Sequence, residues 1–280
     1  MKRALFFALC FAFCAAGAGV PQRIVSLSPD LTEMLYGVGA FSRVVAVSNF
    51  DTYPPEVAKL AHVGQLDNLN FEKLTALRPD LVVVNEAQAP FLEDTLKQLG
   101  FRILTISNGS IQEVYEAMLA LGRATGNESE AIRLVAATRE GLDQVARRTG
   151  ALSKPRVVMI VDRIPGTLRD LYTATDGSYL AQLVEIAGGR IAVPPVANGY
   201  AKLSKEDLLA ANPDVILDFV HGAKSRFAGD PLEAWQEMPE LKAMRNHRVY
   251  AVNEDFVPHA SQRMVQTAEL FAKLIHPELQ

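Results

Sequence analysis

Short apolar runs rich in Val and Ile alternate along the chain with segments whose apolar positions recur every three or four residues. The runs are typical of strands buried on both faces of a parallel sheet, and the periodic segments are typical of amphipathic helices. The predicted strands are residues 23–27, 44–48, 81–84, 102–106, 156–161, 215–219 and 248–252. The predicted helices are residues 28–38, 71–77, 90–99, 111–124, 179–186, 205–211 and 262–275. This alternation predicts an α/β fold assembled from right-handed βαβ units.

The segment of residues 126–150 interrupts the alternation. It reads GNESEAIRLVAATREGLDQVARRTG, contains no strand pattern, and keeps its apolar residues at helical spacing. Asn127 suits the start of a helix and Gly150 suits its end. A helix of about 20 residues is ~30 Å long, which is the width of a small domain. The sequence therefore predicts two Rossmann-like lobes, residues 22–125 and 152–280, joined by this one long bridging helix.

Each predicted lobe carries the same short segment. FEKLTALRPDLVVV begins at residue 71 and KEDLLAANPDVILD begins at residue 205. At a constant offset, Glu, Leu, Ala, Pro and Asp recur in the same order in both segments. Helix–turn–strand units with Pro-Asp turns are common in α/β proteins, so ordinary turn chemistry is one explanation. The other explanation is a pair of similar lobes, in which case a ligand is expected in the cleft between them.

Composition and charge narrow the class of protein. The 280 residues are 49% hydrophobic and 21% charged, which is typical of a globular protein with enough apolar material for two cores. The formal net charge is -4, and basic residues form no stripe along the sequence. This charge distribution argues against nucleic-acid binding.

The N-terminus has the pattern of a secretory signal. Lys2 and Arg3 precede an apolar run, and small residues at 16–18 suit signal peptidase, so residues 1–18 are predicted to be a cleaved signal peptide and the mature protein to be periplasmic. Both cysteines, Cys10 and Cys14, lie inside this segment. A lipid anchor on Cys14 would require small residues before it, and the Phe that precedes it disfavours that alternative. The mature chain is then expected to contain neither a disulfide nor a reactive thiol.

No enzyme motif is present in the sequence. It contains no G-x-S-x-G nucleophile elbow, no phosphate-binding G-x-x-x-x-G-K-[ST] and no G-x-G-x-x-G that opens a helix. Its five histidines form no H-x-x-x-H or H-E-x-x-H pair, so no metal site is predicted. We expect no catalytic residues and no cofactor. The remaining enzyme hypothesis is a secreted α/β enzyme whose catalytic residues converge only in three dimensions.

Several segments together resemble a known family. They are RIVSLSPDLTEMLYGVGA, SNFDTYPPEV, VGQLDNLNFEKLTALRPDLVVV, LSKEDLLAANPD and EDFVPHASQRMVQTAELF. They resemble the substrate-binding proteins of bacterial ABC importers in which a helical backbone links two lobes, and the likeness covers nearly the whole mature chain. Within that family the likeness is greatest to the cobalamin-binding members, while other members bind haem or ferric siderophores. The resemblance implies a monomeric extracytoplasmic binding protein that delivers a corrinoid to an ABC permease dimer in the inner membrane.

The resemblance also suggests a function for the repeated acid. In the cobalamin- and siderophore-binding members, one exposed Glu on each lobe contacts arginines of a permease subunit. Glu72 and Glu206 occupy those positions. A protein with two lobes that meets a twofold-symmetric permease needs one such acid on each lobe. The alternative is that each Glu only stabilises the first turn of its helix through the helix dipole.

The ligand contacts are likewise implied by the resemblance. A corrin is a broad, partly apolar plate, which suits aromatic side chains at the edge of a cleft. The resemblance implies that Tyr53, Tyr172, Tyr200 and the Asp255-Phe256 pair contact the ligand, with the tyrosines expected in loops between strands.

The chain departs from the cobalamin-binding pattern at two positions. Leu66 and Asn85 stand where that pattern has tryptophans, which leaves haem or a ferric siderophore as alternative ligands. Haem would use Tyr53 as a phenolate ligand of iron, and an anionic siderophore would use arginines. The candidate arginines are Arg163, Arg169 and Arg226. His259 is a further candidate metal ligand, with an ordinary surface position as the alternative.

Overall fold

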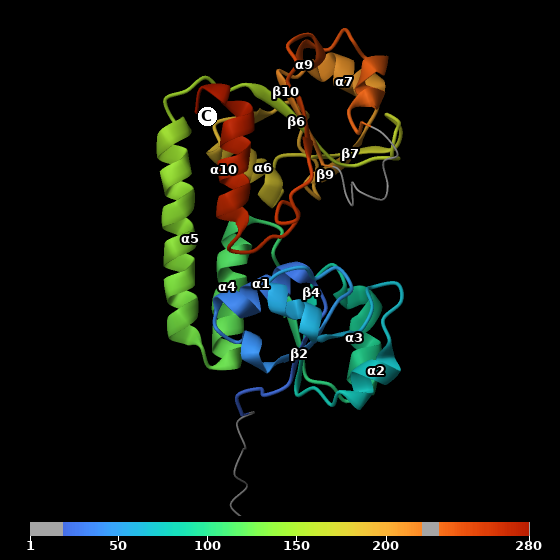
Figure 1. The fold of residues 1–280 in the computed structure, drawn as a ribbon, viewed down its shortest axis with the longest axis vertical. Helices are drawn as coiled ribbons and strands as arrows, with labels where there is room; N and C mark the ends of the chain where they lie inside the picture. The colour runs from blue at the N-terminus through green and yellow to red at the C-terminus, as the bar shows by residue number, and fades with distance from the viewer. Residues whose placement is uncertain (1–18, 220–229, 280) are drawn as a thin grey trace, which may run out of the picture.

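The computed structural model describes residues 19–219 and 230–279. The predicted signal segment with both cysteines, and Arg226, lie outside the described residues. Two α/β lobes are stacked along the long axis of the molecule, and helix α5 (Glu128–Thr149) runs along one side of both (Figure 1). Helix α5 contacts α1 (Pro29–Gly37) and α4 (Ile111–Thr125) of the first lobe. It also contacts α6 (Tyr179–Ile186) and α10 (Met264–Ile275) of the second. The predicted fold class, two α/β lobes joined by a long helix, is confirmed.

The N-terminal lobe contains a five-stranded sheet in which every strand pair is parallel. Its strand order is β3-β2-β1-β4-β5. The strands are β1 (Ile24–Ser26), β2 (Val44–Val47), β3 (Ala61–His62), β4 (Leu81–Asn85) and β5 (Ile103–Ile106). The helices around the sheet are α1 (Pro29–Gly37), η1 (Phe41–Arg43), η2 (Pro55–Lys59), α2 (Phe71–Ala76), α3 (Ala89–Gln98) and α4 (Ile111–Thr125).

Strand β4 shows why the apolar runs of this lobe are continuous. Leu81 and Val83 belong to the core cluster on one side of the sheet, whereas Val82 and Val84 belong to the cluster on the other side. Successive side chains of a strand point to opposite faces, so a strand covered by helices on both faces must be apolar at every position.

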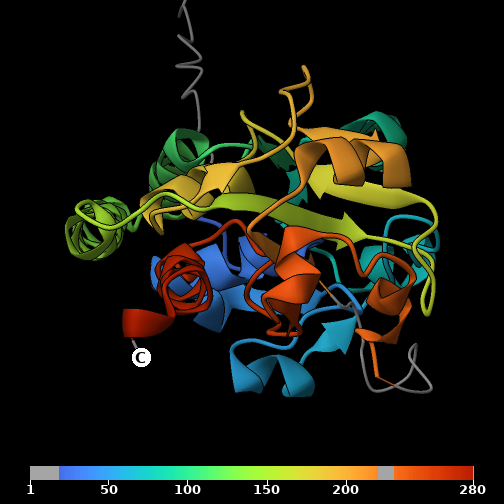
Figure 2. The same cartoon turned by 90° about the horizontal axis from the view of Figure 1, so that it is seen from above.

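The C-terminal lobe contains a mixed sheet with the strand order β11-β10-β6-β7-β9, and β8 pairs with β6. The strands are β6 (Arg156–Asp162), β7 (Leu171–Ala174), β8 (Arg190–Ile191), β9 (Tyr200–Leu203), β10 (Val215–Phe219) and β11 (Val249–Val252). The helices are α6 (Tyr179–Ile186), η3 (Glu233–Glu237), α7 (Lys205–Ala211), α9 (Lys242–Arg245), α10 (Met264–Ile275) and η4 (Pro277–Leu279). Figure 2, viewed from above, shows α5 at the margin of the molecule beyond these sheets.

The prediction of uniform strand–helix alternation is wrong in this lobe. Strand β7 pairs antiparallel with β6 and with β9, so this part of the sheet is antiparallel and is not built from βαβ units. They are short, and their sequences LYTA and YAKL lack the long Val/Ile run of a doubly covered strand. Tyr172 and Tyr200 therefore lie within strands, not in the loops where they were expected.

The repeated segment has the same structural function in both lobes. Asp80 precedes β4, and its carboxylate accepts hydrogen bonds from the backbone N–H groups of Gln22 (2.7 Å) and Arg23 (2.9 Å), just before β1 begins. Asp214 precedes β10, and its carboxylate accepts one from the N–H of Arg156 (2.8 Å) at the start of β6. In each lobe the aspartate thus joins the strand that follows it to the start of its parallel neighbour.

The backbone before each Pro-Asp pair is also alike. Arg78 and Asn212 both have positive φ, at 46° and 37° respectively. The preceding helices begin at equivalent caps, because Asn70 accepts from the N–H of Lys73 (2.8 Å) and Ser204 accepts from the N–H of Asp207 (3.1 Å). Two segments with matching caps, turns and strand contacts support the interpretation that the lobes are similar units.

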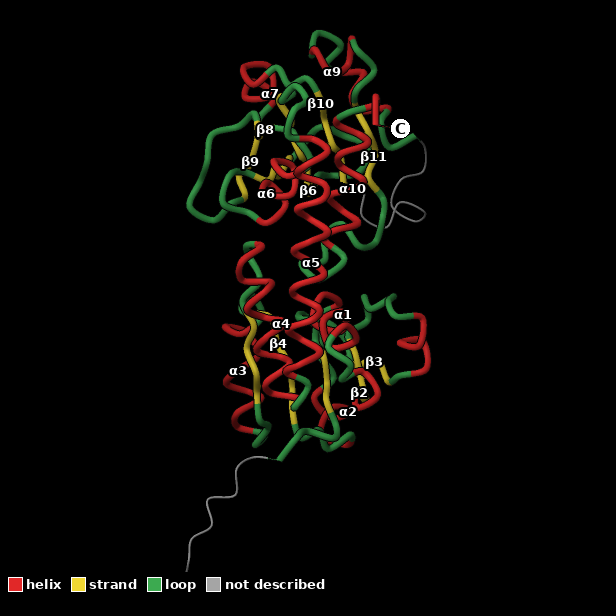
Figure 3. The backbone as a smooth tube through the Cα atoms, turned by 90° about the vertical axis from the view of Figure 1, so that its left-hand side faces the viewer, coloured by secondary structure: helices red, strands yellow, loops and turns green. Residues whose placement is uncertain are grey.

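Figure 3 shows the two lobes one above the other, with α5 continuing past the level at which they meet. Hydrogen bonds also join the lobes: Thr52, in the loop after β2, contacts Asp255, in the loop after β11, and Glu33 of α1 contacts His259. At the start of α4, the backbone N–H of Ile111 donates to the side chain of Gln182 in α6 over 3.0 Å. Among the described residues, no helix is long and apolar enough to cross a membrane.

Candidate ligand-binding site between the lobes

Loops at the carboxyl ends of strands from both lobes meet between them. The hydroxyl of Thr52, in the loop after β2, donates to the carboxylate of Asp255, in the loop after β11, over 2.9 Å. Ligands of open α/β sheets bind outside the carboxyl ends of the strands. The region around this contact is therefore the candidate site.

Tyr53 is the next residue of the N-terminal loop and is half-buried. Its ring packs edge-to-face against Tyr36, with the ring centroids 5.6 Å apart. The guanidinium of Arg263, from the C-terminal lobe, lies 4.4 Å from the centroid of the Tyr53 ring. Tyr53 is thus contacted from both lobes.

Asp255 and Phe256 approach the same arginine from the C-terminal lobe. A carboxylate oxygen of Asp255 accepts from Nη2 of Arg263 over 3.1 Å, and the Arg263 guanidinium lies 5.1 Å from the centroid of the Phe256 ring. Three of the predicted ligand residues, Tyr53, Asp255 and Phe256, are therefore gathered around one side chain that the sequence did not single out.

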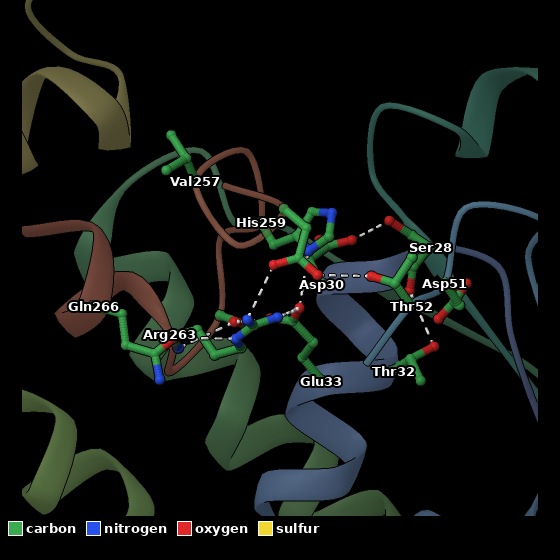
Figure 4. Close-up of polar contacts among 12 residues, drawn as sticks. Ser28, Asp30, Thr32, Glu33, Asp51, Thr52, Val257, His259, Arg263 and Gln266 are labelled. Atoms are coloured by element: carbon green, nitrogen blue, oxygen red, sulfur yellow. Dashed lines mark hydrogen bonds and ion pairs between the residues drawn. The ribbon is translucent and has the colours of Figure 1, made fainter. Parts of the chain in front are cut away.

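Glu33 of α1 anchors this group from the N-terminal lobe (Figure 4). Its side chain is fully buried. One carboxylate oxygen contacts Nδ1 of His259 and Nη1 of Arg263, each at 2.8 Å, and the other accepts from the hydroxyl of Ser261. Nε2 of Gln262 donates to the Glu33 backbone carbonyl over 2.7 Å.

His259 is consequently not a plain surface residue, because its half-buried ring is a partner of Glu33. The hypothesis that His259 ligates a metal gains no support. Among the described residues, no group of three or more His, Cys, Asp and Glu side chains is placed to hold a metal ion.

Tyr172 and Tyr200 form a second aromatic group on the neighbouring strands β7 and β9. Tyr172 pairs with Lys202 and Tyr200 pairs with Ala174. The two tyrosines are 37% and 38% exposed, and Nζ of Lys202 lies 5.5 Å from the Tyr172 ring centroid. Burial of the remaining part of the Tyr200 ring raises the pKa of its phenol. Strands β7 and β9 lie on the side of this lobe that is nearer the N-terminal lobe (Figure 1).

The two residues that depart from the cobalamin-binding pattern differ in their surroundings. Leu66 is exposed, at 39%. Asn85 is half-buried at the end of β4, where its Nδ2 donates to Asn108 (2.7 Å) and to Asp30 (3.2 Å). Asp30 is buried, and Asn108 also donates to it. Asp30 follows β1, Asn85 ends β4 and Asn108 follows β5. The sequence analysis singled out only Asn85, although a position at the carboxyl end of a strand was a usable signal for all three residues.

Two of the three arginines proposed for an anionic ligand lie in the described part of the chain. Arg163 is buried and its guanidinium binds Asp218 through Nε (3.0 Å) and Nη2 (2.8 Å), so its charge is already compensated. Arg169 is exposed beside β7. Arg163 therefore forms a buried ion pair with Asp218, which argues against its membership of an arginine cluster for an anionic ligand.

Glu72 and Glu206 lie away from this group, in the first turns of α2 and α7, and both are exposed. Neither acid has its charge buried, so each is free to meet a cation on another molecule without a large desolvation cost. The first-turn position also satisfies the alternative explanation, stabilisation by the helix dipole.

Two lobes with strand ends facing each other and a linking helix along one side define a solute-binding protein. Comparison with known families agrees: residues 24–256 match the family described as periplasmic binding protein, and the chain belongs to it. Its family and fold are those of periplasmic solute-binding proteins.

Two relatives are similar over most of their length. The chain is 31% identical over 262 residues to the ABC transporter substrate-binding lipoprotein YvrC of Bacillus subtilis, covering 92% of this chain and 81% of YvrC. It is 27% identical over 249 residues to a vitamin B12-binding protein of Vibrio cholerae, covering 89% of this chain and 87% of that protein.

Solved structures show the same fold. The periplasmic vitamin B12 binding protein BtuF of Vibrio cholerae has a TM-score of 0.77 at 25% identity, covering 93% of this chain and 99% of BtuF. The periplasmic haem-binding protein HutB of Vibrio cholerae has a TM-score of 0.79 at 20% identity, covering 91% of this chain and 99% of HutB. The second likeness concerns the fold alone.

Proposed function

We propose that this protein binds a corrinoid, with cobalamin as the preferred ligand, between its lobes and delivers it to an ABC permease dimer at the inner membrane. The protein acts as a monomer in the periplasm after its signal segment is removed. The observation that carries the proposal is the approach of Tyr53 and Phe256, from different lobes, to one side chain. The vitamin B12-binding relatives, which align over most of the chain, support the same ligand class.

The chemistry of the candidate site suits a corrinoid. A corrin offers an extended, partly apolar face, which aromatic rings contact favourably, and a rim of amide side chains. The aromatic contacts would come from Tyr53 and Phe256 and from the exposed tyrosines of β7 and β9. Asp255, which is exposed at the edge of this group, would accept a hydrogen bond from an amide of the ligand.

The polar residues at the strand ends of the N-terminal lobe add to the amide-binding capacity. Asn85 and Asn108 carry amide groups that both donate and accept, and Asp30 orients them. Where the cobalamin-binding pattern has an aromatic side chain, Asn85 would exchange ring contact for hydrogen bonds. Leu66 would supply apolar contact without a ring.

Haem or a ferric siderophore is the second candidate ligand. For haem, the supporting observation is that the Tyr53 phenol belongs to the inter-lobe group and could act as an iron ligand. The buried Arg163–Asp218 pair weakens the siderophore hypothesis, because it removes one of the three arginines proposed to compensate an anionic ligand.

A titration calorimeter tests the corrinoid proposal. Cyanocobalamin added to the purified mature protein should release heat that saturates at one ligand per chain, and Tyr53→Ala should weaken the binding. The absence of any heat from cyanocobalamin would refute the proposal. The mass of the ligand recovered after long incubation should be unchanged; a changed mass would favour the secreted enzyme hypothesis instead.

A further inference from the structure

The side chain at the centre of the inter-lobe group is Arg263, at the residue before α10. Its guanidinium contacts residues of both lobes, and its side chain is only 13% exposed. We propose that Arg263 is the positioning residue of the ligand site, holding Tyr53 and Phe256 at a fixed spacing before the ligand arrives, and that Glu33 holds Arg263 in place. This inference rests on the proposed function, because it takes these two rings to be ligand contacts.

Glu33 is a buried acid whose hydration has been removed. A carboxylate without water is costly unless charged or hydrogen-bonding partners replace its hydration. The partners that face the Glu33 carboxylate are His259, Ser261 and Arg263, which all belong to one short segment of the opposite lobe. An N-terminal-lobe charge is therefore compensated from the C-terminal lobe, so separation of the lobes here would expose an unpaired carboxylate.

Hydrogen bonds fix the orientation of the Arg263 guanidinium. Arginine presents five N–H donors in a rigid planar fork. Nη1 donates to Glu33 (2.8 Å), Nη2 to Asp255 (3.1 Å) and Nε to Gln266 (3.3 Å). With all three nitrogens engaged, rotation of the guanidinium about its own axis would break at least one hydrogen bond.

The rings of Tyr53 and Phe256 both lie against the Arg263 guanidinium. A fixed guanidinium plane fixes where an aromatic face can stack, and Tyr53 and Phe256 lie 4.4 Å and 5.1 Å from its carbon. Cations attract the faces of aromatic rings, more strongly where water is excluded. Tyr53 belongs to the N-terminal lobe and Phe256 to the C-terminal lobe, so their separation is set through Arg263.

Replacing Arg263 by lysine tests whether this residue acts through the shape of its guanidinium or only through its positive charge. Lysine keeps the positive charge and a contact with Glu33, but its single ammonium cannot also bind Asp255 and present a planar face to two rings. Arg263→Lys should therefore loosen the spacing of the lobes while leaving the buried carboxylate paired. Arg148→Lys is the matched control, because Arg148 of α5 forms an exposed ion pair with Glu269 of α10 that no ligand residue shares.

The spacing can be measured without a ligand. Ala76 and Ala210 are exposed residues at equivalent positions of α2 and α7, one on each lobe. Both native cysteines lie in the predicted signal segment, so Ala76→Cys and Ala210→Cys provide the labelling sites of the mature protein. Pulsed electron–electron double resonance between nitroxides at these sites reports the distribution of inter-lobe distances.

The expected result is one narrow distance distribution in the parent and in Arg148→Lys, and a clearly broader one in Arg263→Lys. Glu33→Gln, which removes the anchoring charge, should broaden it as well. Asp255→Asn, at an exposed position that leaves the buried contact with Glu33 intact, should do so to a smaller extent and remains informative if a buried variant fails to fold. The cyanocobalamin affinity of Arg263→Lys should fall about tenfold, which corresponds to ~1.4 kcal/mol.

The outcomes separate this proposal from the proposed function. Unchanged narrow distributions in Arg263→Lys and Asp255→Asn would overturn the positioning role, whatever the ligand. Broadened distributions in a protein whose parent form does not bind cyanocobalamin would uphold the control of lobe spacing by Arg263 and refute the corrinoid assignment. Broadening with no loss of affinity in a protein that does bind cyanocobalamin would show that the spacing does not serve the ligand site, and would also overturn the proposal.

Discussion

Glu72 and Glu206 occupy equivalent positions in the two lobes. Each is exposed in the first turn of a helix, and each helix leads through a residue with positive φ into an aspartate that joins the central strands of its lobe. An acidic side chain at these two positions does not follow from the fold, because a helix needs no acid at that place to form. A pair of equivalent acids on two lobes matches the requirement of a twofold-symmetric partner.

Charge reversal tests this docking interpretation. Glu72→Arg or Glu206→Arg should abolish ligand uptake in cells, because a like charge would then face the arginines that the docking interpretation expects on the permease. The ligand affinity of the purified variants should stay within about threefold of the parent protein, which is less than 1 kcal/mol.

Glu128→Arg is the control for helix effects, since Glu128 is also an exposed acid in the first turn of its helix, α5. It should reduce uptake little, even though it reverses the same favourable interaction with a helix dipole. Equal loss of uptake in all three variants would contradict the docking interpretation and would show that Glu72 and Glu206 only stabilise their helices.

The tyrosines of β7 and β9 provide a test of the aromatic site. Tyr172→Ala and Tyr200→Ala should each weaken ligand binding about tenfold, because a ring in contact with a ligand face contributes roughly 1 kcal/mol or more. Titration calorimetry measures the effect. Leu99→Ala, which removes a 43% exposed apolar side chain at the C-terminal end of α3, is the control and should leave the affinity unchanged. Tyrosine variants that bind as tightly as the Leu99 variant would exclude these rings from the site.

The buried ion pair of the C-terminal lobe should be structural. Asp218 is fully buried and accepts from Arg163 and from Nε1 of Trp235 (2.7 Å). Asp218→Ala would leave a guanidinium and an indole N–H without this acceptor, so the free energy of unfolding should fall by about 3–5 kcal/mol in urea denaturation. Glu140→Ala breaks an exposed pair with Arg147 and should have no measurable effect. A loss of ligand affinity in a fully folded Asp218 variant would instead place Arg163 at the ligand.

Asp51 gives a prediction with pH. Burial raises the pKa of its carboxyl above the ordinary value of 3.8, and hydrogen bonds from Ser48 only partly oppose this. The folded protein therefore holds this proton more tightly than the unfolded chain does. The stabilisation that Asp51 contributes to the free energy of unfolding is present at acid pH. It is lost as pH rises from about 3.8 through the raised folded-state pKa of Asp51.

Asp51→Asn keeps an oxygen for the Ser48 donors and removes the titration. The unfolding free energy of this variant relative to the parent should rise with pH and level off once pH exceeds the raised folded-state pKa of Asp51. Asp207→Asn should show the opposite sign, because hydrogen bonds from Ser204 hold the pKa of Asp207 below its ordinary value. The stabilisation from Asp207 is present above that ordinary value and is lost as pH falls. A pH-independent difference for Asp51→Asn would show that its carboxyl titrates normally.

The sequence predicted the parts of the fold that depend on local pattern. Continuous apolar runs identified β4 and β10 because each strand is covered on both faces. Strands β7 and β9 were missed because each has only four residues and lacks a Val/Ile run, so neither period nor composition distinguishes them from loops. The antiparallel pairing that places Tyr172 and Tyr200 on adjacent strands could not be predicted for the same reason.

The candidate site could be predicted only in part. The resemblance proposed Tyr53, Asp255 and Phe256 for it, but it did not point to Arg263 or Glu33, because these two partners are separated by 230 positions in the chain. Within α1, Glu33 looks like an ordinary helix residue, and only the contact with the other lobe shows that it is buried. Pairing across such a distance has no local sequence pattern.

One titration series decides whether this protein is a corrinoid-binding protein. Cyanocobalamin, hemin and a ferric siderophore are added separately to the purified mature protein, and heat and visible absorbance are recorded for each. A corrinoid-binding protein should bind cyanocobalamin tightly and saturably and should bind the other two weakly or not at all. Tight binding of hemin with a new tyrosinate-to-iron absorption band, and none of cyanocobalamin, would contradict it and assign Tyr53 to haem.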